Sequence, residues 1–377
     1  MEDDDALLVL ARCGAGAAPL RALLGAAESP ARALAGGETV WQAAGLDLAS
    51  CAALHRPDPR QLDSDRAWLQ SSPRHHLLAW TSPDYPDLLR AAPSPPALLF
   101  VVGDADLLWH PQVAVVGSRR PSAGGIENAR AFARSFGLAG LAVTSGLAAG
   151  VDTAAHRGVM ETFRSIAVLG TGPDRCYPPA NAGLMERIAA EGVILSEHPP
   201  GTEAIAAHFP SRNRLVASLT LGTLVVEAAL RSGALITARL AAEAGREVFA
   251  LPGSIHNPLA RGCHRLIRQG AGLAETPEEI IEALAAVAES LAQQLRSRLA
   301  AVPTSPMTAA AHRPARNQEP EAPEQALLWR SLGHDPATLD QLCERTGLTV
   351  GPLSAMLLTM ELNGKISLAH GRYCRRS

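Results

Sequence analysis

Residues that could bind a phosphate group follow a short apolar segment near the middle of the first half of the chain. The β-branched run Val113–Val116 predicts a buried strand, and it ends in Gly117-Ser118-Arg119-Arg120. A helical pattern follows from about Glu127. Where a strand, a glycine turn and a helix start meet, free backbone N–H groups and the positive end of the helix dipole point at one place. Arg119 adds a planar guanidinium that matches phosphate geometry, so we expect a phosphorylated ligand here.

The parts that would recognise a nucleotide cofactor are missing from this segment. A dinucleotide site needs G-x-G-x-x-G after the first strand and a carboxylate at the end of the next one. Here Gly117 is followed by Ser118 and two arginines, and the next predicted strand, Leu141–Thr144, is followed by Ser145-Gly146. A Walker A loop is also excluded, because no G-K-[ST] occurs in the sequence. We therefore expect a phosphate site without a cofactor.

Three more loops follow predicted strands and should meet at the same edge of a sheet. They are SGLAAGVD at Ser145–Asp152, YPPAN at Tyr177–Asn181 and FPSRNR at Phe209–Arg214. Asp152 is expected to cap the helix that follows it. Arg212 and Arg214 lie two residues apart, so on a helix they could not share a face. In an extended or N-cap segment both could reach a nucleic-acid backbone.

The elements that must position these loops alternate between apolar strands and amphipathic helices. This alternation predicts an α/β fold, with a mostly parallel sheet and helices on both faces. The ligand then belongs at the carboxyl ends of the strands. The predicted strands are 113–116, 141–144, 166–170, 193–196, 223–226 and 248–251, and the helices between them are 127–138, 152–162, 182–190 and 235–244.

Breaks in composition predict four segments. In residues 1–75 short helical patterns alternate with Gly and Pro. This pattern predicts a small helical domain of the SAM-like type. Residues 76–291 form the sheet domain, and 292–323 a proline-rich linker. Residues 324–377 predict three short helices and a β-wing from Lys365 to Arg376, which is the order of a winged-helix domain.

Composition limits where the protein works and how it contacts phosphate. Of the 377 residues 47% are hydrophobic, and no apolar run is long enough to span a membrane. The acidic start, Glu2–Asp5, is unlike a signal peptide, so a cytoplasmic protein is expected. The six cysteines form no C-x-x-C pair, which favours free thiols over a metal site or disulfides. The net charge is −3, and Lys365 is the only lysine among 34 basic residues, so phosphate contacts would come from arginine.

Together, the five motifs resemble the DprA/Smf family of DNA-processing proteins of natural transformation. The resemblance rests on GSR at 117–119, on the three loop motifs named above, and on EAALRSGALITAR at 227–239. It is dense from Tyr85 to Leu273 and looser at both ends. It departs from the family at Gly262–Ile267, where relatives usually read G-T-N-x-L-I, and in the YPPAN segment, which lacks the lysine that some relatives carry there.

This resemblance implies an extended Rossmann-like domain. It also implies a protein that binds and protects single-stranded DNA and helps to load RecA recombinase onto it during DNA uptake. It also implies a homodimer built on the sheet domain, for which the segment Val248–Ile267 is our candidate interface. No catalysis is implied. Carried over by motif, the residues expected to face DNA are Gly117, Ser118, Arg119, Gly146, Leu147, Asn181, Arg212, Asn213, Arg214, Ser232, Gly233 and Thr237.

The alternative is a nucleotide or nucleoside-monophosphate hydrolase that uses Glu227 and Asp152. Related folds with that activity carry P-G-G-x-G-T-x-x-E, but Ser218–Gly222 replace the proline and paired glycines here, and Glu227 comes one residue too late. Asp152 and His156 are an i, i+4 pair that could bind a metal or exchange protons. They lack a third ligand in register, so a cap and a helix-face histidine are favoured. No metal site is expected.

The predicted third helix of the winged-helix segment, Pro352–Leu362, is unlike one that reads DNA. It has no basic residue to reach base edges in the major groove. Leu353, Met356, Leu357 and Met360 repeat at helical spacing and should pack the core of this segment, while Leu358 and Leu362 widen the apolar face. We expect the segment to dock a protein or the rest of its own chain.

Overall fold

The computed structural model describes residues 2–301 and, beyond them, positions 328, 337–338, 342, 346, 348, 353, 356–357, 360, 366–369 and 372–375. The chain divides into two compact units, residues 1–303 and 304–377. Within the described residues, no helix combines the length and the apolar character that crossing a bilayer requires.

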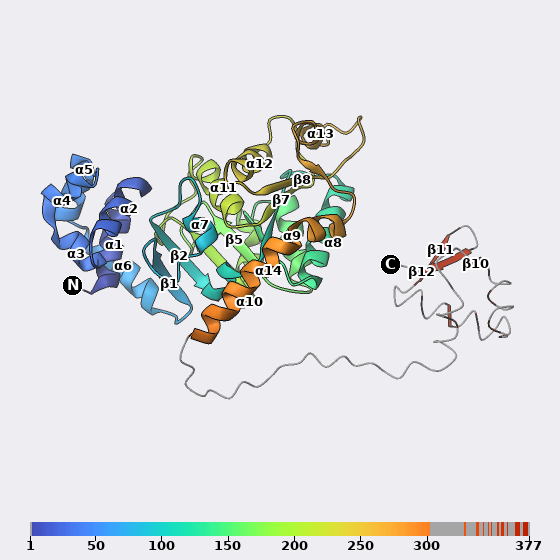
Figure 1. The fold of residues 1–377 in the computed structure, drawn as a ribbon, viewed down its shortest axis with the longest axis horizontal. Helices are drawn as coiled ribbons and strands as arrows, with labels where there is room; N and C mark the ends of the chain where they lie inside the picture. The colour runs from blue at the N-terminus through green and yellow to red at the C-terminus, as the bar shows by residue number, and fades with distance from the viewer. Residues whose placement is uncertain are drawn as a thin grey trace. The chain divides into compact units, whose positions relative to one another are not determined.

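A nine-stranded sheet forms the centre of the first unit, in the order β1-β2-β6-β5-β4-β3-β7-β8-β9 (Figure 1). β1 pairs antiparallel with β2, and β2 with β6, whereas the other neighbours are parallel, so β2 alone runs against the rest. The mostly parallel sheet predicted from the sequence is thus confirmed. The strands are β1 (His75–Ala79), β2 (Leu98–Gly103), β3 (Gln112–Val116), β4 (Ala142–Ser145), β5 (Ser165–Leu169), β6 (Val193–Ser196), β7 (Gly222–Val225), β8 (Glu247–Ala250) and β9 (Gly272–Leu273).

Helices cover both faces of this sheet, as expected for strands that are buried on both sides. One face packs against α8 (Ala123–Leu138), α9 (Val151–Val159), α10 (Ala182–Glu191) and α14 (Pro277–Ala301). The other face packs against α7 (Asp87–Arg90), the 3-10 helix η1 (Ala105–Trp109), α11 (His208–Ser218), α12 (Gly233–Glu243) and α13 (Arg261–Arg268). A short 3-10 helix, η2 (Pro179–Asn181), precedes α10.

The topology places a crevice beside β3. From β3 the chain continues through β4, β5 and β6 on one side, and through β7, β8 and β9 on the other. The loops that leave β3 and β7 therefore diverge, and ligands of open α/β sheets bind at such a point, outside the carboxyl ends of the strands. The glycine-rich segments found in the sequence lie here.

Six short helices precede the sheet and share a core of their own, which includes Leu7, Leu23, Trp41 and Leu54. This core also takes in Leu98 of β2. The helical start predicted from the sequence is confirmed, and β1, which begins at His75, was not foreseen. The helices are α1 (Asp3–Arg12), α2 (Ala17–Ala26), α3 (Pro30–Ala35), α4 (Gly37–Ala43), α5 (Leu48–His55) and α6 (Pro59–Gln70).

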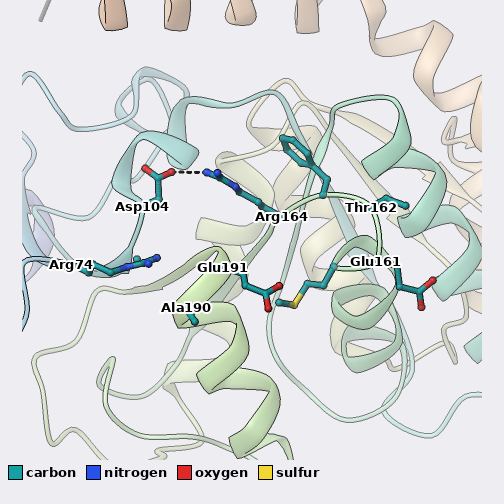
Figure 2. A pocket seen from close by; sticks show the side chains of 10 residues that line it. Arg74, Asp104, Glu161, Thr162, Arg164, Ala190 and Glu191 are labelled. Atoms are coloured by element: carbon teal, nitrogen blue, oxygen red, sulfur yellow. Dashed lines mark hydrogen bonds and ion pairs between the residues drawn. The ribbon is translucent and has the colours of Figure 1, made fainter. Parts of the chain in front are cut away.

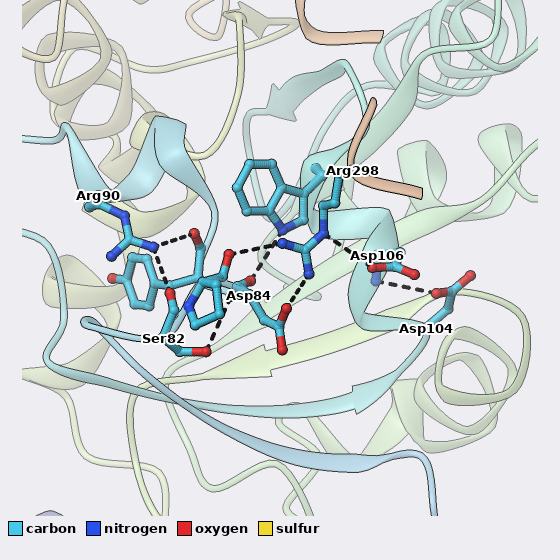
Figure 3. A network of polar contacts seen from close by, with 9 residues as sticks. Ser82, Asp84, Arg90, Asp104, Asp106 and Arg298 are labelled. Carbon is cyan, nitrogen blue, oxygen red and sulfur yellow. Dashed lines mark hydrogen bonds and ion pairs between the residues drawn. The ribbon is translucent and has the colours of Figure 1, made fainter. Parts of the chain in front are cut away.

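The last helix of the first unit, α14, continues to Ala301, past the point where the sequence predicted the linker to begin. Arg298 holds its end in place (Figure 3). The guanidinium pairs with Asp84, donates to the Pro83 carbonyl at 2.8 Å and lies 4.6 Å from the centre of the Trp109 ring. Helix α14 is thus fastened at its far end to the segments before β2 and β3.

In the second unit, β11 (Ile366–Ala369) and β12 (Arg372–Arg375) form an antiparallel hairpin, and β10 (Ala337–Thr338) pairs with β12. The predicted β-wing is therefore confirmed. The expected apolar stripe also forms the core of this unit, because Leu353, Leu357 and Met360 pack with Leu328, Leu342 and Ile366. Leu358 and Leu362 lie outside the described residues.

Candidate nucleic-acid site

A cavity of about 330 Å³ lies at the carboxyl edge of the sheet, beside β3. We call it the carboxyl-edge cavity. The turn after β3, the start of α9, the middle of α11 and the first turn of α12 contribute to its wall. Its lining contains seven of the twelve residues expected from the sequence. The lining residues are Val116, Gly117, Arg119, Ala148, Asp152, Arg212, Asn213, Ser232, Gly233, Ala234 and Thr237.

The Gly117–Arg119 turn is held by backbone contacts that allow only glycine at its first position. A Cβ at Gly117 would lie 2.7 Å from Val151 Cγ2 and 2.9 Å from the Glu227 carbonyl oxygen. The Ser118 N–H donates to that same carbonyl at 2.7 Å, and the Ser118 carbonyl accepts from Val151 N–H at 3.1 Å. The turn is therefore rigid, and it presents the exposed Arg119 side chain at the mouth of the cavity.

Arg212 is the buried charge of the site. Its side chain reaches from α11 into the wall of the cavity, where the residue is only 4% exposed. Nη1 donates to the Val168 carbonyl at 2.5 Å, whereas Nε is buried without a partner. Among the described residues, Arg212 forms no ion pair. Burial lowers the pKa of Arg212, and the nearby Asp152 carboxylate opposes this shift.

The loop from Ser145 to Asp152 is braced so that it frames Arg212. A Cβ at Gly146 would lie 2.0 Å from Arg212 Nη1, so the guanidinium packs against the loop backbone. Asp152 Oδ2 accepts from the N–H groups of Gly146 at 3.0 Å and Ala148 at 3.3 Å. Burial raises the pKa of Asp152, while Arg212 and these N–H groups oppose the shift.

The expected role of Asp152 as an N-cap is wrong. Gly150 occupies the N-cap of α9, with φ of 84°, and Asp152 lies inside the first turn. The carboxylate binds the amides of the preceding loop instead, because that loop turns back over the helix start.

His156 lies on the buried face of α9, within the core. Its Nε2 accepts from the Leu147 N–H at 3.2 Å, and Nδ1 lies 2.7 Å from Ser165 Oγ. Ser165 Oγ donates its own proton to the Val143 carbonyl at 3.0 Å. The His156 Nδ1 therefore carries the ring proton and donates a hydrogen bond to Ser165 Oγ. Burial, with a contribution from Arg212, lowers the pKa of His156 to about 3, so the ring is neutral.

Two of the expected contact residues shape the loop. Leu147 is fully buried with φ of 57°, so its side chain belongs to the core. Asn181 is buried as well, and its Nδ2 donates to the Leu147 carbonyl and to Thr153 Oγ1, both at 2.9 Å. Both residues hold the backbone that frames the cavity.

Arg212 and Arg214 lie on α11 and do not share a face. Arg214 points away from the carboxyl-edge cavity, pairs with Glu197 and donates to the Ser94 carbonyl at 2.8 Å. Asn213 lines the cavity, and none of its side-chain atoms has a hydrogen-bond partner among the described residues.

The first turn of α12 supplies the polar end of the cavity. Ser232 is the N-cap, and its Oγ accepts from the Ala234 N–H at 3.3 Å. Gly233 leaves the helix end open, since a Cβ there would meet no atom within 4 Å. The positive end of this eleven-residue helix thus borders the cavity together with Arg119 and Arg212, as suits an anion.

Two aromatic residues beside the cavity were missed in the sequence. The Arg119 guanidinium lies 5.8 Å from the centre of the Phe209 ring, and Phe209 lies 5.2 Å from Tyr177. Tyr177 is 45% exposed. Tyr177 begins the YPPAN motif and Phe209 begins the FPSRNR motif. Only 4% of the chain is aromatic, so an aromatic residue in each of these loops was a usable signal.

Glu227, the carboxylate that the hydrolase alternative would need, has a structural role. Glu227 accepts from Ser122 N–H at 2.8 Å and Ser122 Oγ at 2.6 Å, and from Asn257 Nδ2 at 3.1 Å. Ser122 is the N-cap of α8, so Glu227 fixes the start of that helix. A Cβ at Gly125 would lie 2.5 Å from Oε2, which leaves no room for a substrate on that side.

A larger hollow, of about 760 Å³, lies at the opposite edge of the sheet (Figure 2). It is lined by residues before β5, after α10 and at the end of β2. Arg164 pairs with Asp104 at 2.6 Å, and Glu161 and Glu191 also line the wall. The three acidic residues of this lining outnumber its two arginines, Arg74 and Arg164, so it lacks the positive charge of an anion site.

Comparison with known proteins agrees with the motifs. Residues 76–285 match the family model described as DNA recombination-mediator protein A, and residues 311–372 match the DprA winged helix domain. The chain is 38% identical to the Smf protein of Escherichia coli over 89% of this chain and 86% of that protein. It is 46% identical to DprA of Streptococcus pneumoniae over 49% of this chain and 66% of that protein.

Two solved structures have the same fold. The X-ray structure of DprA from Streptococcus pneumoniae superposes with a TM-score of 0.67 and 34% identity, over 75% of this chain and 98% of that one. A structure of DprA from Helicobacter pylori, reported for its single-stranded DNA binding mode, has a TM-score of 0.51 and 30% identity, over 56% and 95% of the two chains.

Proposed function

The chain belongs to the DprA/Smf family of DNA-processing proteins, and on that premise we propose that it binds single-stranded DNA in the carboxyl-edge cavity. The observation that carries the proposal is the state of Arg212. A guanidinium has five N–H donors, and one of these makes the only hydrogen bond of this buried side chain to a described residue. A phosphate oxygen in the cavity would supply the missing acceptor and the missing negative charge.

The neighbours of the cavity suit a single strand better than a duplex. Arg119 at the mouth would contact a second phosphate, and the first turn of α12 would contribute N–H groups. The exposed ring of Tyr177, with Phe209 beside it, offers a surface on which an unpaired base can stack. In a duplex the faces of the bases are covered, so this contact would be lost.

The proposed activity is binding and protection of the strand in the cytoplasm, without catalysis. Glu227 and Asp152, the carboxylates that a hydrolase would need, each accept at least two hydrogen bonds from the fold. Incubation with nucleotides should therefore give no turnover, whereas a labelled oligonucleotide should be retained. Turnover that disappears in a Glu227→Gln variant would instead favour the hydrolase.

Binding is tested directly with the Arg119→Ala variant. Fluorescence anisotropy with a single-stranded oligonucleotide should show weaker binding than the wild-type chain, while Arg60→Ala, an exposed arginine of α6, should change nothing. Equal affinity of the wild type for single-stranded and duplex DNA would contradict the proposal.

We also propose that the protein acts as a homodimer that loads RecA, as the family resemblance implies. Two linked cavities would raise avidity without a new kind of contact. The segment Val248–Ile267 borders a groove of about 700 Å³ between α12 and α13, and exposes Ile255. Sedimentation should find a dimer at micromolar concentrations. Faster assembly of RecA on single-stranded DNA in the presence of the protein would support loading, and an unchanged rate would oppose it.

A further inference from the structure

A second groove, of about 650 Å³, lies over helices α8, α9 and α10. We call it the α9 groove. It is lined on three sides by helices, so its shape is set by packed elements rather than by loops. The side chains that matter here are Ile126 and Arg130 from α8, Thr153 and Arg157 from α9, and Leu184 and Arg187 from α10.

The charge of the α9 groove is positive overall. Glu161 is the only acidic residue of the lining, and it is shared between Arg130, with Nε to Oε1 at 2.7 Å, and Arg134, at 3.6 Å. Arg187 pairs with Glu191, but both side chains are about half exposed. Exposed ion pairs of this kind are weak, so a phosphate could replace the carboxylate at little cost.

Arg157 is the arginine of the groove whose guanidinium has the fewest contacts. Its side chain is exposed near the end of α9 and makes no hydrogen bond or ion pair with any residue in the described part of the chain. Its guanidinium is therefore available to a ligand without breaking an existing contact. Beside it, Ile126 is 46% exposed on α8 and gives the groove an apolar wall.

The α9 groove begins directly behind the turn that presents Arg119. Gly150 lines the groove, and a Cβ at this position would lie 2.4 Å from the Ser118 carbonyl oxygen and 2.8 Å from the carbonyl carbon of Arg119. Arg120 lies exposed on the same turn. From Gly150 to Arg157 the path follows α9 for roughly 10 Å. Ala148 lines the carboxyl-edge cavity and Gly150 lines the α9 groove, so the two hollows take residues from the same loop only two positions apart.

We propose that the α9 groove is a second subsite for the same DNA strand, which binds nucleotides next to those held in the carboxyl-edge cavity. This inference rests on the proposed function. Arginine beside exposed apolar surface matches a single-stranded nucleic acid, whose backbone is charged and whose bases are apolar on their faces. A duplex would present the charge without the bases, and Ile126 would then gain no partner.

A length series of oligothymidylates tests the subsite with Arg157→Ala and Arg157→Gln. Arg157 is exposed, so both variants should fold, which thermal melting checks. The affinity of the wild-type chain should rise with length once the strand extends beyond the cavity. On long strands each variant should bind about five-fold more weakly, as expected for the loss of one exposed charge contact. The slope of log affinity against log salt should also become less steep by ~0.7. On the shortest strand that binds, affinity should match the wild type.

Arg60→Ala is the matched control and should leave every length unchanged. Equal losses on short and long strands would overturn the proposal, because Arg157 would then act through the cavity or the fold. An affinity that does not grow with length in the wild type would also overturn it. Unchanged binding of long DNA by the variants, together with loss of binding to a poly-glutamate peptide, would assign the groove to an acidic protein. Failure of the wild type to bind any strand would remove the proposed function itself.

Discussion

At the scale of single residues, Arg212 carries a cost in folding stability that the proposed DNA site would explain. A buried guanidinium with an unpartnered Nε loses hydration that the fold does not fully replace. A bound phosphate would complete these contacts, as proposed above. Burial keeps His156 neutral by lowering its pKa, and the nearby Arg212 adds to this shift.

We predict that Arg212→Met binds single-stranded DNA at least ten-fold more weakly, a loss of about 1.4 kcal/mol or more. Its free energy of unfolding should stay the same or rise, because an apolar side chain of similar length removes the cost of the buried charge. Urea denaturation and anisotropy measure the two quantities. A drop of about 3 kcal/mol or more in unfolding free energy would show that Arg212 is needed for the fold.

A second residue-scale prediction concerns the pH dependence of stability. Burial lowers the pKa of His156 from 6.5 to about 3, so between these values the unfolded chain takes up a proton that the folded chain does not. His156 therefore stabilises the fold fully above pH 6.5, and this contribution is lost as pH falls toward 3. We expect His156→Gln, which keeps an acceptor for the Leu147 N–H, to show a smaller loss of stability over this window.

The control for this prediction is the difference in unfolding free energy between the wild type and His156→Gln, measured at each pH. Asp152, whose pKa burial raises, acts in the opposite direction at low pH and is present in both proteins. Subtracting the two stability curves therefore isolates His156. Parallel curves from pH 7 to pH 4 would contradict the assignment of a neutral buried ring.

At the scale of elements, the Ser145–Asp152 loop positions the binding charge through its backbone. Gly146 packs against the Arg212 guanidinium, and Leu147 anchors the loop in the core. We predict that Gly146→Ala displaces Arg212 and weakens DNA binding about as much as Arg212→Met does. Heteronuclear NMR or circular dichroism should still show a folded protein.

Gly183→Ala is the matched control for this variant. A Cβ at Gly183 meets no atom within 4 Å, and the residue lies in the first turn of α10, where alanine favours the helix. Binding should therefore be unchanged. Normal binding by Gly146→Ala would show that the guanidinium does not need its present position.

The sequence predicted these elements better than it predicted the contacts. Six apolar runs became strands of the sheet within a residue or two, because burial on both faces demands long β-branched or aliphatic runs. Asp152 was placed wrongly because a sequence pattern cannot show that the loop folds back over α9. Phe209 and Tyr177 were missed since their proximity depends on α11 lying beside the YPPAN segment, a contact between distant parts of the chain.

At the scale of the whole molecule, the two units have separate cores. The described residues of the second unit pack among themselves through Leu328, Leu353 and Leu357. The helix that a winged-helix domain would use to read bases is the one that carries two of these core residues, Leu353 and Leu357. We therefore propose that the first unit, and not the second, binds DNA.

We predict that the chain shortened to residues 1–303 binds single-stranded DNA nearly as well as the full chain. This fragment retains the carboxyl-edge cavity, and it retains the contacts by which Arg298 holds the end of α14. Anisotropy with the same oligonucleotide measures the difference. A loss of ten-fold or more, about 1.4 kcal/mol, would show that residues 304–377 are a true DNA-binding element.

The most direct test of the central claim is a salt titration of single-stranded DNA binding. If Arg119 and Arg212 contact phosphates, log affinity should fall linearly with log salt, and each Arg→Ala change should flatten the slope by ~0.7. Arg214→Ala should change the slope less, because that side chain pairs with Glu197 outside the cavity. Slopes that stay at the wild-type value in both the Arg119 and Arg212 variants would contradict the claim that the carboxyl-edge cavity binds the strand.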